Sequence, residues 1–597
     1  MRWEGPVRGV CLCEGLSVTE LYNLGFFLVR HPISSSFIII ICHFPNLLSF
    51  FIIVSAFATS NAHVPYHFEP PTEFVIDGYS LTPRALVMLS YGLTKLTICP
   101  EAMDRVRASR RVVDGILARG ETKYGINTGF GKFSSVLIDA DKLVELQENL
   151  IRSHCAGVGY PLSPNRVRML MLHRLNVLVR GNSGVSEETV LQFVHAFNNH
   201  CLPYIPEKGT VGASGDLAPL SHLALGLMGE GRMWNGTGDG RNENDWVEAS
   251  AVLASKSLKP IKLKAKEGLA LINGTQLITS LTCEALFRGQ NMLKSACIIA
   301  SLTNDALLGT PDAYHSLIQE VRPHRGQKRT AALMRACLDR EGNRSPLRES
   351  HHNCSNVQDA YSLRCVPQVH GIVEDMLNFV EGILQTELNS SLDNPMVFAD
   401  HDGLIISGGN FHGEYPAKAA DMLAIALSEL ASLSERRQER LMNPDLSEGL
   451  PAFLCDQPGL ESGFMIAHCT SAALVCENRT LSMPASVESL PTSAAKEDHV
   501  SMGGMAARKA LTVAEHVEQC LAIECLAASQ AIALRKLQTT PILEKSLHAF
   551  REYAPVRVGD AEMSTSIAAA HKGILENCLW RAAKTEIEAY LQTQKLE

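Results

Sequence analysis

The sequence predicts an all-α protein that ends in a long helix bundle. Apolar residues recur at three-to-four spacing through most of the chain after residue 72, and prolines and glycine-rich loops separate these periodic segments. The segments 367–389, 415–442 and 506–538 are long enough to build a bundle. In the last of them, Val513, Val517, Leu521 and Cys525 recur every four residues, which indicates a buried stripe.

The first 72 residues do not fit this pattern and are predicted to be an atypical apolar extension. Residues 37–58 are mostly apolar and end in Ala56-Phe57-Ala58, which has the form of a signal-peptidase site. However, the segment before this run is long and nearly neutral, and Pro45 interrupts the run itself. Two interpretations stay open: a signal or membrane anchor, and an appended segment outside the fold.

Residues 73–280 are predicted to form an N-terminal region, and residues 281–597 the central bundle with C-terminal helices. Helical periodicity covers 83–119, 143–154, 164–179 and 186–199. Ser186 followed by two glutamates is a favourable helix start. The segment 236–244 is rich in Gly, Asn and Asp, which predicts a mobile surface insertion.

Composition is that of an enzyme acting on small molecules. The 597 residues are 46% hydrophobic and 20% charged, with a formal net charge of −9 and no Lys/Arg-rich stretch, which argues against nucleic acid as a partner. The 17 cysteines show no C-x-x-C pair or zinc-ligand spacing, so reduced thiols, a cytoplasmic location and no metal are expected.

The triplet Ala213-Ser214-Gly215 can close on itself into an electrophile. Because Gly215 has no Cβ, its amide nitrogen can attack the carbonyl of Ala213, and Ser214 can then lose water to become an exocyclic alkene. The product would be a methylidene-imidazolone, a Michael acceptor. Taken alone, the triplet is more typical of a tight turn that caps a helix.

Seven separate blocks resolve that ambiguity. They are residues 124–133, 149–154, 209–221, 267–275, 358–364, 407–412 and 496–502. From about Phe74 to the C-terminus, the chain resembles the aromatic amino acid ammonia-lyases through these blocks. The resemblance implies an all-α homotetramer whose active sites combine residues of different subunits. It also implies that 4-methylidene-imidazol-5-one (MIO) forms autocatalytically from the triplet, with no external cofactor.

The resemblance also assigns roles to individual residues. Tyr124 matches the candidate base for the β-proton, and Tyr361 matches a second active-site tyrosine. Arg364 matches the anchor of the substrate carboxylate, a role that suits the bidentate guanidinium fork. Asn273 and Gln358 match polar side chains that surround the electrophile in the family, and Phe411 matches an aromatic residue beside it.

The predicted substrate depends chiefly on the dipeptide Ser153-His154 and on Glu497. Aryl-selective relatives typically carry Phe-Leu or His-Leu at the dipeptide and Gln at the position of Glu497, whereas histidine-selective members carry the residues found here. Glu497 can accept a hydrogen bond from one imidazole nitrogen and His154 can satisfy the other, which would disfavour a phenyl ring. Elimination of ammonia from L-histidine to give trans-urocanate, the first step of histidine degradation, is therefore expected.

Several alternatives stay open at this point. The substrate amine or the substrate ring could attack the electrophile, and either tyrosine could act as the base. A tyrosine- or phenylalanine-selective ammonia-lyase or aminomutase would use the same electrophile, and a helical oligomer could keep the scaffold without activity. The sequon Asn273-Gly-Thr275 argues against a secreted form, because a glycan there would fill the active site.

Overall fold

The computed structural model describes residues 71–92, 94–339, 344–350 and 357–594, together with three short strands nearer the N-terminus. The chain divides into two compact units, Met1–Val64 and Pro65–Glu597. In the first, β1 (Phe26–Arg30), β2 (Ile38–Cys42) and β3 (Phe51–Ile52) form an antiparallel sheet in that order. The tripeptide Ala56-Phe57-Ala58 lies outside the described residues, so the signal-peptide interpretation is not tested.

The prediction of one helix over residues 83–119 was wrong. Two helices, α2 (Pro83–Tyr91) and α3 (Pro100–Arg119), are separated by the strand β5 (Lys95–Ile98). This strand pairs in parallel with β4 (Glu73–Ile76), so its backbone hydrogen bonds go to the sheet instead of a helix. Pro100 then occupies the first turn of α3, where a missing N–H costs least.

The remaining helices of the N-terminal region agree closely with the predicted segments. Predictions for residues 143–154, 164–179 and 186–199 are confirmed to within a residue at each end, and Ser186 caps its helix by accepting a hydrogen bond from the Thr189 amide. The elements are α4 (Leu143–His154), α5 (Pro164–Leu178), α6 (Glu187–Asn198), α7 (Leu217–Leu227), α8 (Ala249–Ser255) and α9 (Glu267–Ile272). Two antiparallel strand pairs accompany them, β6 (Val158–Pro161) with β7 (Pro206–Lys208) and β8 (Arg232–Trp234) with β9 (Trp246–Glu248).

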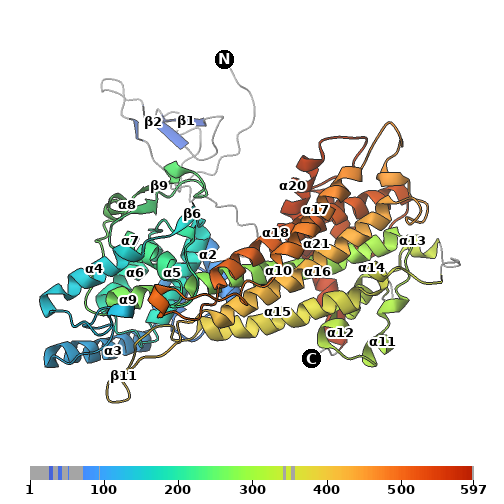
Figure 1. The fold of residues 1–597 in the computed structure, drawn as a ribbon. Coiled ribbons are helices and arrows are strands. Elements are labelled where there is room, and N and C mark those ends of the chain that lie inside the picture. The colour runs from blue at the N-terminus through green and yellow to red at the C-terminus, as the bar shows by residue number, and fades with distance from the viewer. Residues whose placement is uncertain are drawn as a thin grey trace. The chain divides into compact units, whose positions relative to one another are not determined.

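Four long helices form the central bundle, and their parallel runs dominate Figure 1. They are α10 (Gln276–Ala306), α15 (Val366–Leu388), α16 (Glu414–Met442) and α18 (Gly503–Arg535). The last three confirm predicted segments, and the predicted stripe of α18 is fully buried. Helix α10 was not among the predicted segments, because almost every residue of that helix is buried, which leaves no polar face.

Buried ion pairs tie the bundle helices together. Arg437 of α16 contacts Glu524 of α18 at 2.5 Å, and Arg288 of α10 contacts Glu518 of α18 at 2.6 Å. Helix α18 is long and apolar enough to cross a membrane, but its most apolar stretch is 83% buried within the protein. It therefore packs as a core helix of the bundle.

Shorter elements surround the bundle. One end of the bundle in Figure 1 carries four short helices, α11 (Ser316–Glu320), α12 (Arg325–Leu338), α13 (Pro346–Glu349) and α14 (Tyr361–Arg364). A separate antiparallel strand pair is formed by β10 (Met396–Phe398) and β11 (Leu404–Ile406). The C-terminal part adds α17 (Met465–Leu481), α19 (Pro541–Arg551), α20 (Met563–Leu575) and α21 (Cys578–Thr593). The all-α prediction is confirmed, since the described strands form only sheets of two or three short strands.

Candidate active site

The cyclisable triplet lies in the loop between β7 and α7. Ala213 and Gly215 are buried, whereas Ser214 between them is only partly buried and lines a large pocket. Gly215 has a φ of +74°, and a Cβ at this position would lie 2.3 Å from the carbonyl oxygen of Gly274. The backbone therefore approaches Gly274 more closely than any residue with a side chain would permit.

Four helix N-termini hold this loop. The Asp216 carboxylate accepts hydrogen bonds from the Leu277 and Ile278 amides in the first turn of α10, at 2.8 and 3.0 Å. Asp216 itself immediately precedes α7. At the starts of α16 and α18, the Gly413 amide donates to the Gly212 carbonyl and the Met502 amide donates to the Val211 carbonyl. The positive ends of four helix dipoles thus surround the triplet, which favours negative charge there.

The pocket above Ser214 has a volume of about 1320 Å³. Six of the predicted site residues line it: Tyr124, His154, Ser214, Asn273, Phe411 and Glu497. These residues come from segments spread over more than 370 positions of the chain, and folding places their side chains around one pocket.

Asn273 contacts the triplet directly. Its side-chain amide donates to the Ser214 carbonyl at 2.7 Å, and the residue is only 3% exposed. The Oδ1 atom of Asn273 is buried and has no hydrogen-bond partner among the described residues. A buried, unpartnered acceptor beside a reactive loop is the kind of atom that a ligand or a rearranged backbone satisfies.

Glu497 is held by hydroxyl groups in a loop before α18. Thr492 Oγ1 and Ser493 Oγ each donate to Glu497 Oε2 at 2.7 Å. Burial raises the pKa of Glu497. The hydrogen bonds from Ser214, Thr492 and Ser493 lower that pKa by more than burial raises it, so the net shift is downward. The side chain is therefore an ionised acceptor at neutral pH. It is not a helix cap, because α18 begins six residues later.

His154, at the end of α4, faces the same pocket. Its Nδ1 atom lies 3.0 Å from the hydroxyl of Ser153. Burial lowers the pKa of His154, and the opposing effects of Leu150 and Glu497 do not offset that shift. The imidazole is therefore neutral at neutral pH and offers one donor and one acceptor nitrogen.

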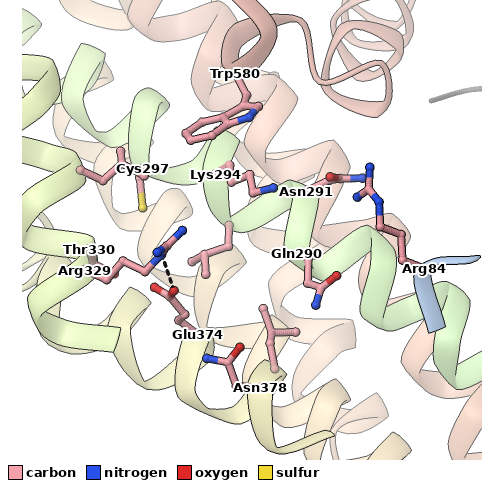
Figure 2. Close-up of a pocket in the computed structure, with 13 residues that line it drawn as sticks. Arg84, Gln290, Asn291, Lys294, Cys297, Arg329, Thr330, Glu374, Asn378 and Trp580 are labelled. Atoms are coloured by element: carbon pink, nitrogen blue, oxygen red, sulfur yellow. Dashed lines mark ion pairs between the residues drawn. The ribbon is translucent and has the colours of Figure 1, made fainter. Parts of the chain in front are cut away.

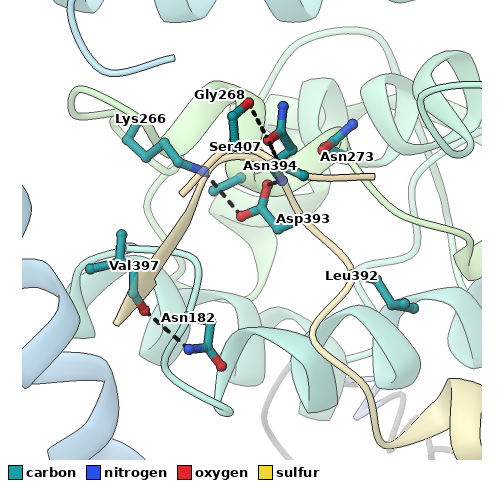
Figure 3. A network of polar contacts seen from close by, with 12 residues as sticks. Asn182, Lys266, Gly268, Asn273, Leu392, Asp393, Asn394, Val397 and Ser407 are labelled. Carbon is teal, nitrogen blue, oxygen red and sulfur yellow. Dashed lines mark hydrogen bonds and ion pairs between the residues drawn. The ribbon is translucent and has the colours of Figure 1, made fainter. Parts of the chain in front are cut away.

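A polar network, buried at one end, supports one wall of the pocket (Figure 3). Lys266 and Asp393 are both fully buried and form an ion pair at 3.1 Å. The next residue, Asn394, accepts hydrogen bonds from Ser407 and from the amide of Gly408, both at 2.8 Å. Asn394, Ser407 and Gly408 all line the pocket, so this network fixes its shape.

Tyr124 lies against this wall. The next residue, Gly125, has a φ of +73°, and a Cβ there would come within 2.8 Å of the Pro395 ring. The glycine thus allows the tyrosine segment to pack directly onto the segment that follows Asn394.

Three predicted site residues do not join the others within one chain. Tyr361 and Arg364 belong to α14, Gln358 precedes it, and none of the three lines the pocket. Helix α15 starts just after Arg364 and ends close to Asn394, and its 23 residues span about 35 Å. Tyr361 is 70% exposed, and the Arg364 guanidinium lies 4.4 Å from the centre of its ring. Figure 1 shows α14 at the end of the bundle remote from α4 and α7.

Sequence reasoning missed the residues that support the site. Thr492 and Ser493 orient Glu497, Asp216 ties the loop to α10, and Lys266 with Asp393 braces the wall. A lone hydroxyl or carboxylate carries no signal in a single sequence. The one signal in the sequence was the pair Thr492-Ser493, which lies five and four residues before Glu497. Thr and Ser side chains favour hydrogen bonds to groups nearby in the chain.

Comparison with known proteins agrees with this geometry. The model of the aromatic amino acid lyase family matches residues 81–552. Histidine ammonia-lyase of Bos taurus is 57% identical over 523 residues, covering 87% of this chain and 78% of that protein. The crystal structure of histidine ammonia-lyase from Trypanosoma cruzi matches with a TM-score of 0.80 and 47% identity, covering 87% and 97% of the two chains. Tyrosine aminomutase from Streptomyces globisporus matches with a TM-score of 0.79 and 36% identity, covering 86% and 99%.

The fold and the pocket therefore define a carbon–nitrogen lyase with an all-α bundle. The chain belongs to the aromatic amino acid lyase family.

Proposed function

We propose that this protein is a histidine ammonia-lyase that converts L-histidine to trans-urocanate and ammonia. The observation that carries this proposal is the presence of neutral His154 and ionised Glu497 in the pocket directly above Ser214. These two groups provide polar partners for both nitrogens of an imidazole, and a phenyl ring would leave them unpaired.

The triplet fits the self-made electrophile. Gly215 has the positive φ and the close backbone approach that only glycine tolerates, and Ser214 is the one member of the triplet that faces the pocket. The Asn273 amide on the Ser214 carbonyl holds the loop where cyclisation must occur. When formed, MIO would supply an electrophilic alkene carbon at the position of Ser214.

The residues around the triplet bind and orient the substrate. Glu497 and His154 hold the imidazole, and Phe411 contributes an aromatic surface beside Ser214. Tyr124 takes the proton from the β-carbon, and the helix N-termini around the loop favour the negative charge that this step requires. Tyr361 is the second candidate for proton transfer.

A second subunit completes the pocket. Gln358, Tyr361 and Arg364 lie about 35 Å along α15 from the cavity of their own chain, so they reach an active site only in another chain. The pocket of about 1320 Å³ exceeds the roughly 300–1,000 Å³ of an ordinary ligand site, as a pocket with a missing wall would. We infer a homotetramer in which Arg364 of one subunit binds the substrate carboxylate held by another.

Complementation tests this arrangement. Ser214→Ala lacks the electrophile and Arg364→Met lacks the carboxylate anchor, so each pure variant should be nearly inactive. Mixed tetramers, formed by co-expression, contain some sites with neither lesion and should recover a fraction of wild-type activity. If both pure variants are inactive and the mixture is no more active than they are, Arg364 acts within its own chain, and an active Arg364→Met variant would show that Arg364 is not the anchor.

The chemistry is tested by following urocanate formation from L-histidine. We expect urocanate from the wild-type chain, none from Ser214→Ala, and an intact mass of the wild type that is two waters below the encoded mass. Cinnamate from phenylalanine or coumarate from tyrosine as the main product would instead assign the aryl-selective activity. An unmodified mass in an active preparation would refute the electrophile.

The remaining inferences concern organisation. We propose that 73–280 is the electrophile-bearing region, that 281–597 is the bundle with C-terminal helices, and that 1–72 lies outside the enzyme core. The 13 cysteines in the described residues are free thiols, which supports a cytoplasmic enzyme. Sequencing the mature N-terminus from its natural source tests the first boundary.

A further inference from the structure

A second cavity, of about 240 Å³, lies within the bundle and shares no residue with the catalytic pocket. Helices α10, α12, α15 and α21 enclose it, and α2 contributes Arg84 at its mouth. Figure 2 shows Lys294 of α10 beneath the indole of Trp580, with Arg329 and Glu374 joined by an ion pair beside them.

The cavity carries an excess of positive charge. Arg84, Lys294 and Arg329 line it, and Glu374 is the single carboxylate among its lining residues. Arg329 contacts Glu374 at 2.7 Å. Within the described part of the chain, Arg84 and Lys294 make no ion pair and lie over aromatic rings instead, at 5.6 Å from the centre of Phe287 and 5.4 Å from the centre of Trp580. Outside the lining, Glu588 and Lys584 of α21 act on Lys294 with opposite signs.

The pKa of Lys294 reflects the excess of positive charge in the cavity. Burial lowers the pKa of Lys294, and the neighbouring Arg84 and Arg329 lower it further. Burial also raises the pKa of Glu374 to about 7, so its negative charge is easily lost. The lowered pKa of Lys294 is the shift expected where cations outnumber their counterions, and an added anion would relieve it. The raised pKa of Glu374 has another cause, since burial and Asp375 raise it while Arg329 opposes the shift.

A buried hydroxyl points to the same conclusion. Thr330 lines the cavity, is only 2% exposed, and its Oγ1 atom has no hydrogen-bond partner among the described residues. A buried polar atom without a partner is costly, and such atoms in folded proteins usually contact a ligand or water. Thr330 and Arg329 both line the cavity, so one ligand can contact both side chains.

We propose that this cavity binds a small phosphate-bearing dianion, either inorganic phosphate or a phosphate monoester. Two cations without a carboxylate partner match a dianion better than a monocarboxylate. Ammonium, guanidinium and hydroxyl donors are the groups that bind phosphate oxygens in proteins. Trp580 offers an apolar surface to the organic part of an ester. The inference does not depend on the proposed lyase activity.

The site binds without reacting. Cys297 also lines the cavity, and its Sγ lies 3.4 Å from His370 Nδ1. However, burial raises the pKa of the Cys297 thiol and lowers the pKa of His370, so the pair does not form a thiolate.

Calorimetric titration of the full-length protein with inorganic phosphate and with glycerol phosphate, at constant ionic strength, tests the proposal. We expect saturable binding that Lys294→Met weakens at least about tenfold, as loss of a charge-assisted contact should. Lys572→Met is the matched control, because Lys572 is an exposed lysine of α20 outside the cavity and should leave binding unchanged. Thr330→Val, which keeps the side-chain shape, should weaken binding without affecting the fold.

Four outcomes are informative. Tighter binding of the ester supports an organic phosphate that contacts Trp580, and equal binding supports free phosphate. Unchanged binding in Lys294→Met would overturn the site, as would the absence of binding by a wild-type protein that turns over histidine. Lys294→Met should retain histidine turnover, which separates loss of this site from misfolding.

Discussion

Gly215→Ala should stop the chain from forming its electrophile. A Cβ at this position would lie 2.3 Å from the carbonyl oxygen and 2.5 Å from the amide nitrogen of Gly274. Both neighbours are backbone atoms that cannot rotate away, so the two segments must separate by about 1 Å to restore ordinary contact. That movement breaks the hydrogen bond from the Asp216 amide to the Gly274 carbonyl, which spans 2.7 Å.

The expected cost follows from these contacts. Holding alanine at a φ of +74° costs about 1–2 kcal/mol, and loss of the buried hydrogen bond costs about 1–3 kcal/mol. The sum of about 2–5 kcal/mol lowers the population of the cyclisable loop by roughly 30-fold or more. Intact-mass spectrometry should therefore find the linear chain, two waters heavier than the wild type, with little histidine turnover.

The matched control is Gly236→Ala. Gly236 also has a positive φ, +89°, but a Cβ there would meet no atom within 4 Å. This variant has the same left-handed backbone cost without the collision, so it should mature and retain activity. If Gly215→Ala loses two waters and turns over histidine like the control, the close approach to Gly274 does not govern cyclisation.

Two further predictions concern the supporting residues. The double variant Thr492→Val with Ser493→Ala removes two of the hydroxyl donors that lower the folded pKa of Glu497, so that pKa should rise and the acid limb of the kcat/KM profile should move to higher pH. Activity near neutral pH should fall about tenfold, and an unchanged pH profile would show that the hydroxyls are only structural. Lys266→Met leaves the buried Asp393 carboxylate without its partner and should cost about 3–5 kcal/mol, seen as a lower midpoint in differential scanning calorimetry. Adding Asp393→Leu should restore part of that loss, and a double variant no more stable than the single one would contradict the pairing.

The helices were predictable where local signals agreed with the fold. Ser186 and the two glutamates after it mark the start of α6. The apolar stripe predicted for α18 consists of residues that are buried in the structure. The failures have equally local causes. Residues 95–98 pair with a strand about twenty positions earlier, a contact that periodicity cannot detect. Helix α10 has no polar face, so it lacks the alternation on which helix prediction depends.

The site shows a similar division. Ser214, His154 and Glu497, to which we assign chemical roles, occur in distinctive sequence blocks, and the structure places all three at one pocket. Their supports could not be named from the sequence, because the roles of Thr492 and of the buried Lys266 depend on which group lies beside them after folding. A lysine is normally a surface residue, and only the fold shows that this one is fully buried.

The separation of Tyr361 and Arg364 from the pocket follows from the stiffness of a helix. Helix α15 starts beside Arg364 and ends near Asn394, so one chain cannot bring both ends of it to the same cavity. A sequence motif can identify a residue's role, but it does not indicate which copy of the chain supplies that residue. If Arg364 binds substrate, activity requires assembly, and the exposure of Tyr361 on a single chain is what a residue destined for a neighbour's pocket should show.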